Sequence, residues 1–140
     1  MNRSDIKVKA YAVFRRGTEI LVHKIHEKDG SLKGYRSPGG HVEFGETSLA
    51  TIHREMKEEL NAEITDVSLL KVTENIFTYH DQSCHEIVFI YNARFADPSF
   101  YDMDEIIGDE FGEKFTLYWI DPDKLPSGAA LYPSGLKEAL

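Results

Sequence analysis

The stretch SPGGHVEFGETSLATIHREMKEELNA, residues 37–62, decides how this chain folds. It begins with a Pro-Gly-Gly turn, and its second half repeats apolar residues with the period of a helix. Thr47 or Ser48 is suited to begin that helix, because a hydroxyl can accept a hydrogen bond from a free backbone N–H of the first turn. Asn61 is suited to end it in the left-handed conformation. The stretch therefore predicts a loop, a helix that ends near Leu60, and a second loop.

The predicted helix has two faces of different chemistry. Glu55, Glu58 and Glu59 are spaced i, i+3, i+4 and share one face, where like charges destabilise an isolated helix by a few tenths of a kcal/mol each. A hard divalent cation would offset this repulsion, because Mg²⁺ takes carboxylate oxygens as ligands. Taken alone, such a charge run is more often a solvated surface. At about 100° per residue, an adjacent stripe must face the core. Its members are Leu49, Ile52, Met56 and Leu60.

Length and composition predict a single globular domain, residues 1–140. The chain can hold one sizeable core, and its apolar fraction of 41% is ordinary for such a domain. It has no apolar run of the ~18 residues that a membrane helix needs, and its first residues lack the apolar segment of a signal peptide. Cys84 is the one cysteine, so no internal disulfide can form. We expect a cytoplasmic protein without membrane contact.

The formal net charge of −8 bears on the binding partners. It argues against a broad basic surface for gripping nucleic acid, which makes a nucleic-acid partner an unfavoured prediction. It does not exclude a small anionic ligand, because a bound metal ion can reverse the sign of the local charge. The sequence leaves open a homodimer.

Strands are predicted on both sides of the 37–62 stretch. Residues 8–14 and 19–25 are rich in β-branched and aromatic residues and flank a short RRGT segment, which predicts a hairpin. Further strands are predicted over 63–72 and 86–95. The second of these is nearly all apolar in its middle, which indicates a central strand that is covered on both faces.

The remaining segments predict loops, a last strand and a short helix at the C-terminus. Residues 29–34 predict a loop, because they combine glycines with polar residues. Residues 97–113 predict a long acidic connection, and connections of that length are uncommon and often functional. A last strand is predicted over 115–120 and a short helix over 134–140. The fold class is therefore mixed α/β with one strong helix near the middle.

The glycine turn and the acidic helix together resemble the Nudix box. That box reads Gly, five residues, Glu, seven residues, then Arg-Glu-apolar-any-Glu-Glu-any-Gly-apolar. Six fixed residues in register would occur by chance in about one window per 10⁷, at ~7% abundance each. Asn61 replaces the final glycine, and asparagine is the next-best residue for a left-handed helix end. The residues in register are Gly40, Glu46, Arg54, Glu55, Met56, Glu58 and Glu59.

The resemblance implies a fold, a reaction and a set of site residues. The implied fold is the Nudix α/β/α sandwich with a mixed β-sheet and a central loop–helix–loop. The implied activity is a pyrophosphohydrolase that uses Mg²⁺, with Mn²⁺ as a substitute, to cut a nucleoside diphosphate linked to another moiety. Arg54 is expected to pair with Glu46 and to fix loop to helix. The implied metal ligands are Glu55, Glu58, Glu59 and the carbonyl of Gly39.

Family members often recruit a further glutamate from the late loop, as a metal ligand or a general base. Glu105, Glu110 and Glu113 are the candidates here. We favour Glu113, because it stands just before the predicted strand 115–120. A solvated acidic loop is the alternative for each of them.

The sequence features that indicate the substrate are less specific than the Nudix box. ADP-ribose hydrolases of the family usually carry a proline about sixteen residues past the box, and this chain has none between Ala62 and Pro98. Dinucleoside polyphosphate hydrolases tend to carry a tyrosine in that zone, and Tyr79 lies 17 residues after Ala62. A modified-nucleotide triphosphatase is equally open. The candidate substrate contacts are stacking by Tyr35, Phe77 and Tyr79 and a phosphate contact by Arg36.

Two other classes of function remain open from the sequence. A non-catalytic Nudix module could sense a nucleotide, but a sensor need not retain the full carboxylate set. A decapping-type enzyme could act on RNA ends, but the acidic charge and the missing basic patch argue against it.

Overall fold

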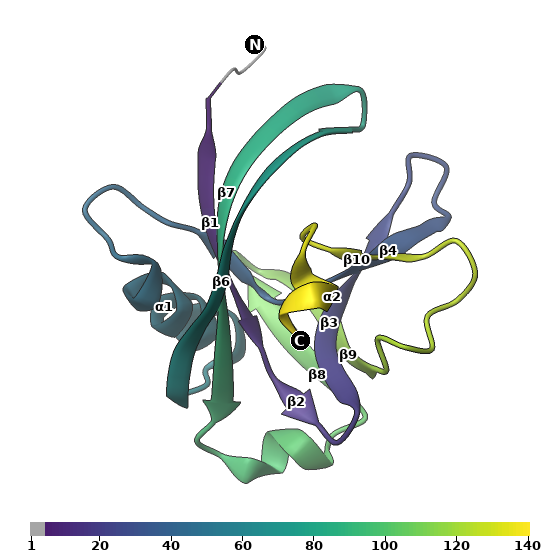
Figure 1. Cartoon of the computed structure of the whole chain (residues 1–140). Coiled ribbons are helices and arrows are strands. Elements are labelled where there is room, and N and C mark those ends of the chain that lie inside the picture. The colour runs from purple at the N-terminus through teal and green to yellow at the C-terminus, as the bar shows by residue number, and fades with distance from the viewer. Residues whose placement is uncertain (1–4) are drawn as a thin grey trace.

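Two β-sheets and one long helix make up residues 5–140, the part of the chain that the computed structural model describes (Figure 1). The first sheet has four strands, in the order β5 (Gly39–His41), β1 (Lys7–Val13), β7 (Gln82–Phe95) and β6 (Ile64–Tyr79). β1 runs parallel to β7 and antiparallel to β5, so this sheet is mixed.

The second sheet has six strands. They are β10 (Ala130–Tyr132), β4 (Leu32–Arg36), β3 (Glu19–His26), β9 (Glu113–Ile120) and β8 (Glu105–Glu110), with β2 (Arg15–Arg16) beside β3. The helices are α1 (Ser48–Leu60), the 3-10 helix η1 (Pro98–Asp102) and α2 (Leu136–Ala139). None of the helices within residues 5–140 is long and apolar enough to cross a bilayer. The mixed sheets and the helix confirm the predicted α/β class with a central loop–helix–loop.

β1 is a central strand with both faces covered. Ala10 and Ala12 pack into the core cluster that includes α1, whereas Tyr11 and Val13 point to the opposite cluster against β3 and β4. This follows from the period of two in a strand, since neighbouring residues point to opposite faces. The prediction of a hairpin between residues 8–14 and 19–25 was wrong. β1 pairs with β5 and β7 in the first sheet, and the short β2 makes the turn back onto β3.

Helix α1 begins and ends as its sequence predicts. The hydroxyl of Thr47 accepts a hydrogen bond from the Ala50 backbone N–H at 3.1 Å, and Asn61 adopts the left-handed conformation with φ 51°. Ile52 and Met56 are fully buried against the first sheet. These contacts fix the direction of the helix and therefore the side on which its glutamates lie.

One residue of the predicted apolar stripe does not reach the core. Leu49 is 44% exposed, because it lies in the first turn of α1, where the helix extends beyond the core. Thr51 is buried beside it and satisfies its hydroxyl locally, donating to Glu46 at 2.7 Å and lying 3.0 Å from the Thr47 carbonyl. The placement of Leu49 in the core was therefore wrong.

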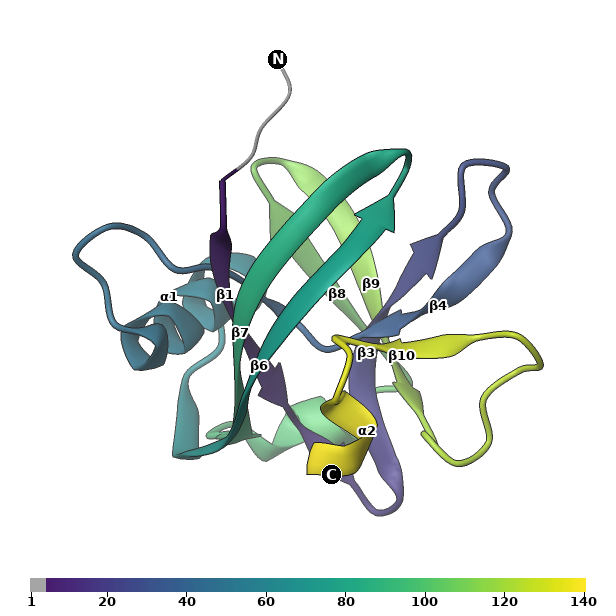
Figure 2. The ribbon, with the colours of Figure 1, turned by 45° about the horizontal axis from the view of Figure 1, so that its top comes forward.

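β6 and β7 form one long curved hairpin that arches toward the β3–β4 hairpin (Figure 2). The prediction of a central strand over 86–95 is confirmed, since β7 lies between β1 and β6. The tips of the two hairpins touch. The Tyr79 hydroxyl donates to the His26 carbonyl at 3.3 Å, and Lys28 forms an ion pair with Asp81. The arch therefore closes over the space between the two sheets.

Two predicted loops contain strands. Residues 97–113 include η1 and β8, because Ile106 is buried in the core and Gly108 leaves room for the ring of Phe115. Residues 32–34 of the predicted loop 29–34 belong to β4. There Gly34 lets β10 approach, since a Cβ at this position would lie 2.1 Å from the Ala130 carbonyl oxygen.

Candidate active site

The Pro-Gly-Gly turn places β5 tightly between β1 and α1. A Cβ on Gly39 would lie 2.0 Å from the Ala10 carbonyl oxygen, and a Cβ on Gly40 would lie 2.5 Å from the Glu55 carboxyl group. Gly39 requires glycine because the atom it would meet is backbone, whereas a Cβ on Gly40 would displace the Glu55 carboxyl group from its present position. The turn therefore lets the carboxylate of α1 lie directly against the backbone of β5.

Arg54 joins the loop to the helix, as the sequence predicts. Its guanidinium donates to both oxygens of Glu46, at 2.7 and 3.0 Å, and to the His41 carbonyl at 3.0 Å. Its Nη1 also donates to Glu55 at 2.9 Å and to Glu58 at 3.3 Å. The hydrogen bonds from Arg54 and then Thr51 lower the pKa of Glu46 to about 2. The fork geometry of a guanidinium suits this arrangement, because it can serve several carboxylates at once.

Glu59 is the buried carboxyl group of the site, with only 7% of its surface exposed. Burial raises its pKa to about 9, helped by a hydrogen bond with Glu55 and by the negative charges of Glu55 and Glu110. The positive charge of Arg36 acts in the opposite direction. Glu59 and Glu55 of α1 are therefore in contact, and the charges of Glu110 on the β8–β9 hairpin and of Arg36 both act on Glu59. We call Glu55, Glu58 and Glu59 the carboxyl cluster.

The late glutamates lie on the β8–β9 hairpin. Glu110 and Glu113 are opposite each other at its tip, and both line a cavity of about 450 Å³ together with His23 and Arg36. Of the two, it is Glu110 whose charge raises the pKa of Glu59. Glu105 pairs with Tyr118 at the other end of the hairpin. Of the three late glutamates, Glu110 is therefore the one whose charge acts on Glu59, and Glu105 lies at the far end of the hairpin.

The donors of this cluster fit a hard divalent cation. Within residues 5–140, no three acidic, histidine or cysteine side chains are close enough to enclose an ion as they stand. Glu55 and Glu58 instead accept hydrogen bonds from Arg54. What favours a cation is the chemistry of the donors, which are all carboxylate oxygens, and the burial of Glu59 beside the like charge of Glu55. The cradle at Gly40, which a Cβ would fill, also holds Glu55 at this place.

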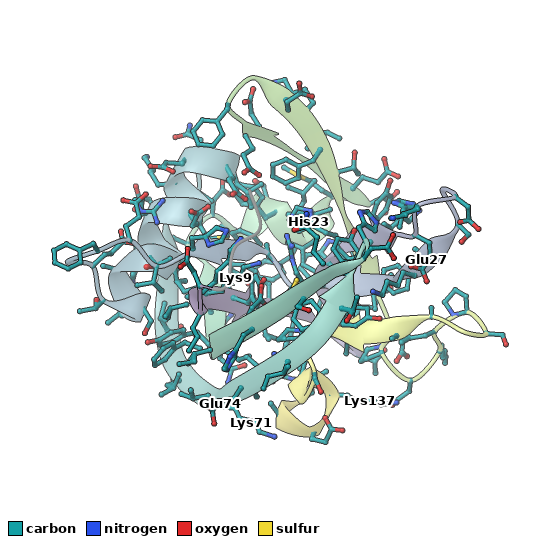
Figure 3. All side chains as sticks on the ribbon, turned by 90° about the horizontal axis from the view of Figure 1, so that it is seen from above. Lys9, His23, Glu27, Lys71, Glu74 and Lys137 are labelled. Atoms are coloured by element: carbon teal, nitrogen blue, oxygen red, sulfur yellow. The ribbon has the colours of Figure 1, made fainter. Side chains whose placement is uncertain are left out.

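A larger cavity of about 930 Å³ lies under the β6–β7 arch. We call it the hairpin cleft. Arg36 lines both the hairpin cleft and the smaller cavity, which is also lined by Glu110 and Glu113. In Figure 3, Lys9 and His23 lie toward the middle of the molecule, whereas Lys71 and Lys137 lie at its edge. The residues that line the cleft include Lys9, Lys33, Arg36, Asn75, Tyr79 and Tyr132.

The floor of the hairpin cleft is polar. Lys9 and Glu86 form an ion pair at 2.7 Å, and the Glu86 side chain is nearly buried. Asn75 lies beside Glu86 on the neighbouring strand and is only 8% exposed. Its amide nitrogen is 3.4 Å from the Thr73 hydroxyl. An amide and a carboxylate on one floor can both donate to and accept from a ligand.

The structure separates the predicted substrate residues into two groups. Arg36, Phe77 and Tyr79 line the hairpin cleft. The ring of Tyr79 stacks on His80 with the centroids 3.9 Å apart, and Lys33 lies over it at 4.6 Å. Tyr35 on β4 is only 5% exposed, and its side chain packs in the core. The prediction that Tyr35 contacts the substrate is therefore corrected, because its side chain has a packing role.

Sequence reasoning missed four polar residues of the hairpin cleft. They come from four strands, and only the register of the sheets brings them together. The available signal was weak, because each is a single polar residue within a strand-like segment. The missed residues are Lys9, Lys33, Asn75 and Glu86.

His23 lies in the smaller cavity, with its ring centroid 4.9 Å from that of Phe115. Burial, and then the positive charge of Arg36, lowers its pKa to about 3. The imidazole is therefore neutral at neutral pH. It can pack beside Arg36 without adding a second positive charge to the site.

His23 should make the protein less stable in acid. In the unfolded chain the pKa of a histidine is near 6.5, whereas the pKa of His23 in the folded protein is about 3. Between these two pH values, His23 is protonated in the unfolded state and neutral in the folded state. Stability should fall across this window by up to about 1.4 kcal/mol per pH unit from this group. In His23→Gln, the free energy of unfolding from urea curves should fall less steeply as the pH is lowered from 6.5 to about 3, because this contribution is lost. The exposed His53→Gln serves as the control, and equal slopes in wild type and His23→Gln would contradict the assignment.

The NUDIX domain family matches this chain over residues 5–138. The crystal structure of a MutT NUDIX hydrolase from Burkholderia pseudomallei is similar, with a TM-score of 0.68 and 24% identity over 97% of this chain and 96% of that one. An ADP-ribose pyrophosphatase from Streptococcus suis has a TM-score of 0.56 and 15% identity, over 87% of this chain and 78% of that one. A MutT protein from Bacillus halodurans also has a TM-score of 0.56 and 15% identity, over 84% and 70%.

The structural likenesses show the fold, and the family match covers nearly the whole described chain. In this fold the glycine turn packs against α1, and Arg54 joins α1 to Glu46 of the loop. This chain therefore belongs to the NUDIX family and is a hydrolase that acts on pyrophosphate bonds of nucleotides.

Proposed function

We propose that this protein is a single-domain, Mg²⁺-dependent hydrolase that cleaves a nucleoside diphosphate linked to another moiety. The observation that carries the proposal is the carboxyl cluster of α1, in which Arg54 binds Glu55 and Glu58 and the buried Glu59 lies beside Glu55. An acidic cluster repels a pyrophosphate unless a cation lies between them, whereas Arg36 attracts it. This combination suits an anionic substrate that binds together with metal.

Glu55, Glu58 and Glu59 would hold the ion, with the Gly39 carbonyl as a further ligand. When bound, Mg²⁺ or its substitute Mn²⁺ would neutralise phosphate oxygens and lower the pKa of a coordinated water. Arg54 contributes by orientation, because it holds Glu55 and Glu58 on one guanidinium. Glu46 fixes Arg54 in turn, through two hydrogen bonds.

The two remaining roles are phosphate binding and general-base catalysis. Arg36 would bind the phosphates beside the bond to be cut, since it lines both cavities and its charge acts on Glu59. A glutamate of the β8–β9 hairpin would accept the proton of the attacking water. We now favour Glu110 over Glu113 for this role, because its charge acts on Glu59.

Substitution of the two glutamates separates them. Glu110→Gln should lower kcat by roughly 10²-fold or more, as expected for a lost general base, while Glu113→Gln should have a smaller effect. The measurement is steady-state hydrolysis at saturating Mg²⁺ for both variants. Because the two residues face each other on one hairpin, each variant is the structural control for the other. A larger loss in Glu113→Gln would restore the assignment made from the sequence.

The hairpin cleft has room for a nucleoside. Gly40 on β5 is level with Val72 on β6, so Asn75 lies three strands across and three residues further along, or about 17 Å away at ~4.8 Å per strand and ~3.3 Å per residue. A base that reached this floor could be read by the amide of Asn75, and Phe77 or Tyr79 could contact its face. The similar structures include both MutT proteins and an ADP-ribose pyrophosphatase, so the fold does not select the substrate. The missing proline after the box favours a dinucleoside polyphosphate or a modified nucleoside triphosphate over ADP-ribose.

A substrate panel with Mg²⁺ tests the proposal. The panel contains dinucleoside polyphosphates, ordinary and oxidised nucleoside triphosphates, nucleotide sugars and capped RNA, and the readout is released phosphate or nucleoside monophosphate. Hydrolysis of one nucleotide class with Mg²⁺ and none with EDTA supports the proposal. Tight nucleotide binding without hydrolysis would support the sensor alternative, and cleavage of capped RNA alone would support decapping. Sedimentation of the same sample tests the proposed homodimer.

A further inference from the structure

Lys33 is a half-buried cation of the hairpin cleft that lacks an acidic partner. Its ammonium lies 4.6 Å from the ring centroid of Tyr79 and 5.5 Å from that of Tyr132. Within residues 5–140 no carboxylate forms an ion pair with it, whereas Lys9 in the same cleft is paired with Glu86. Aromatic faces attract a cation but do not neutralise it. The cleft therefore holds a positive charge that is free to bind an anion.

Lys33 and Arg36 lie on the same strand but at different places in the hairpin cleft. Lys33 and Arg36 are three residues apart on β4, which places their backbone positions about 10 Å apart at ~3.3 Å per residue. The guanidinium of Arg36 lies 5.3 Å from the ring centroid of Tyr11, whereas the ammonium of Lys33 lies beside Tyr79 and Tyr132. The two cations therefore lie against different rings of the cleft. An anion at Lys33 is a second charged group of a substrate whose pyrophosphate binds at Arg36.

The surroundings of Lys33 fix its ammonium at this place. Tyr79 is itself held by a hydrogen bond to the His26 carbonyl and by the stacked ring of His80. Tyr132 comes from β10, where it pairs with Arg36, and its ring lies against Gly34, the residue after Lys33. Two rings from different elements thus limit the rotamers of the lysine, which reduces the entropy lost when an anion binds.

We propose that Lys33 is a specificity-determining residue that binds a second anionic group of the substrate, beyond the pyrophosphate that is cleaved. This inference rests on the proposed function. The shared chemistry is negative charge beyond the scissile pyrophosphate. It can come from additional phosphates in a longer chain, or from a carboxylate on the linked moiety.

Matched substrate pairs test the inference. Diadenosine tetraphosphate is compared with diadenosine diphosphate, and UDP-glucuronate with UDP-glucose, so that each pair differs in distal charge. Lys33→Met keeps the length and the apolar contact with both rings but removes the charge. It should lower kcat/KM for the charged member of the preferred pair by about 10- to 100-fold, mainly through KM, and change the other member little. The pair that responds identifies the source of the charge.

Two control variants separate this role from a structural one. Lys24→Met removes another lysine that lies over a tyrosine ring, 4.1 Å from the centroid of Tyr118, outside the lining of the cleft. It should leave both pairs unchanged, and Lys33→Arg should retain the preference for the charged member. Equal losses of Lys33→Met on both members, or no loss on either, would overturn the role of Lys33 and leave the proposed function intact. A wild-type protein that hydrolyses none of the nucleotides in the full panel would overturn both.

Discussion

Glu59→Gln should lower nucleotide hydrolysis by roughly 10²–10⁴-fold, the usual scale for the loss of a catalytic group. Glu59 is the buried member of the carboxyl cluster, and its charge is opposed by Glu55 and Glu110. Glutamine keeps the shape but carries no charge with which to hold a divalent ion. Steady-state rates at several Mg²⁺ concentrations give the loss and show whether more ion restores it.

The fold of Glu59→Gln should remain intact. Without divalent ions it should melt at the same temperature as wild type or slightly higher, because the substitution removes a carboxyl group that burial disfavours in its charged form. Glu63→Gln is the matched control, since Glu63 follows the same helix, is exposed and pairs with Lys57. It should keep its activity. Retention of more than about a tenth of the wild-type rate in Glu59→Gln would remove Glu59 from the proposed site.

Arg54→Met should affect both stability and activity. Arg54 donates to Glu46, Glu55 and Glu58, so its loss leaves three carboxylates with mutual repulsion and fewer hydrogen bonds. The cost should be about 2–3 kcal/mol, near the value for a lost charged hydrogen-bond partner that is mostly buried. For a domain of this size, Tm should fall by roughly 5–10 °C. Activity should fall by roughly 10²-fold or more, because Glu55 and Glu58 lose their common support.

Conservative and remote variants test the Arg54 assignment. Arg54→Lys should recover little, since an ammonium cannot reproduce the fork that serves Glu46 through two parallel bonds. Arg94→Met removes an exposed arginine of β7 and should change neither Tm nor activity. Full activity in Arg54→Lys would show that a point charge is enough at this position.

The box and its helix could be predicted from the sequence, because their determinants are local. Capping by Thr47, the left-handed end at Asn61 and the pairing of Arg54 with Glu46 depend on residues within one loop–helix–loop. The error at Leu49 has a simple cause. Helical periodicity predicts which face is apolar, but not how far the core extends along the helix.

The cleft and the sheet pairing could not be predicted in the same way. The sequence of β1 is compatible with a hairpin partner or with a parallel one, and only the tertiary structure chooses β7. Lys33 and Asn75 lie 42 positions apart and meet in one cleft because β6 and β7 arch over β4. The choice of Glu110 over Glu113 likewise depends on the two-residue turn of the β8–β9 hairpin. The strand partners and the residues that line the cleft depend on the pairing register, which cannot be derived from neighbouring residues in the sequence alone.

Binding of Mn²⁺, followed by the electron paramagnetic resonance of the free ion, tests the central claim most directly. The claim is that the carboxylates around Glu59 hold a divalent cation for pyrophosphate hydrolysis. Wild type should bind Mn²⁺, Mg²⁺ should compete for the same site, and Glu59→Gln should bind Mn²⁺ roughly tenfold more weakly or worse. Equal Mn²⁺ affinity in wild type and Glu59→Gln would contradict the claim and place the ion elsewhere.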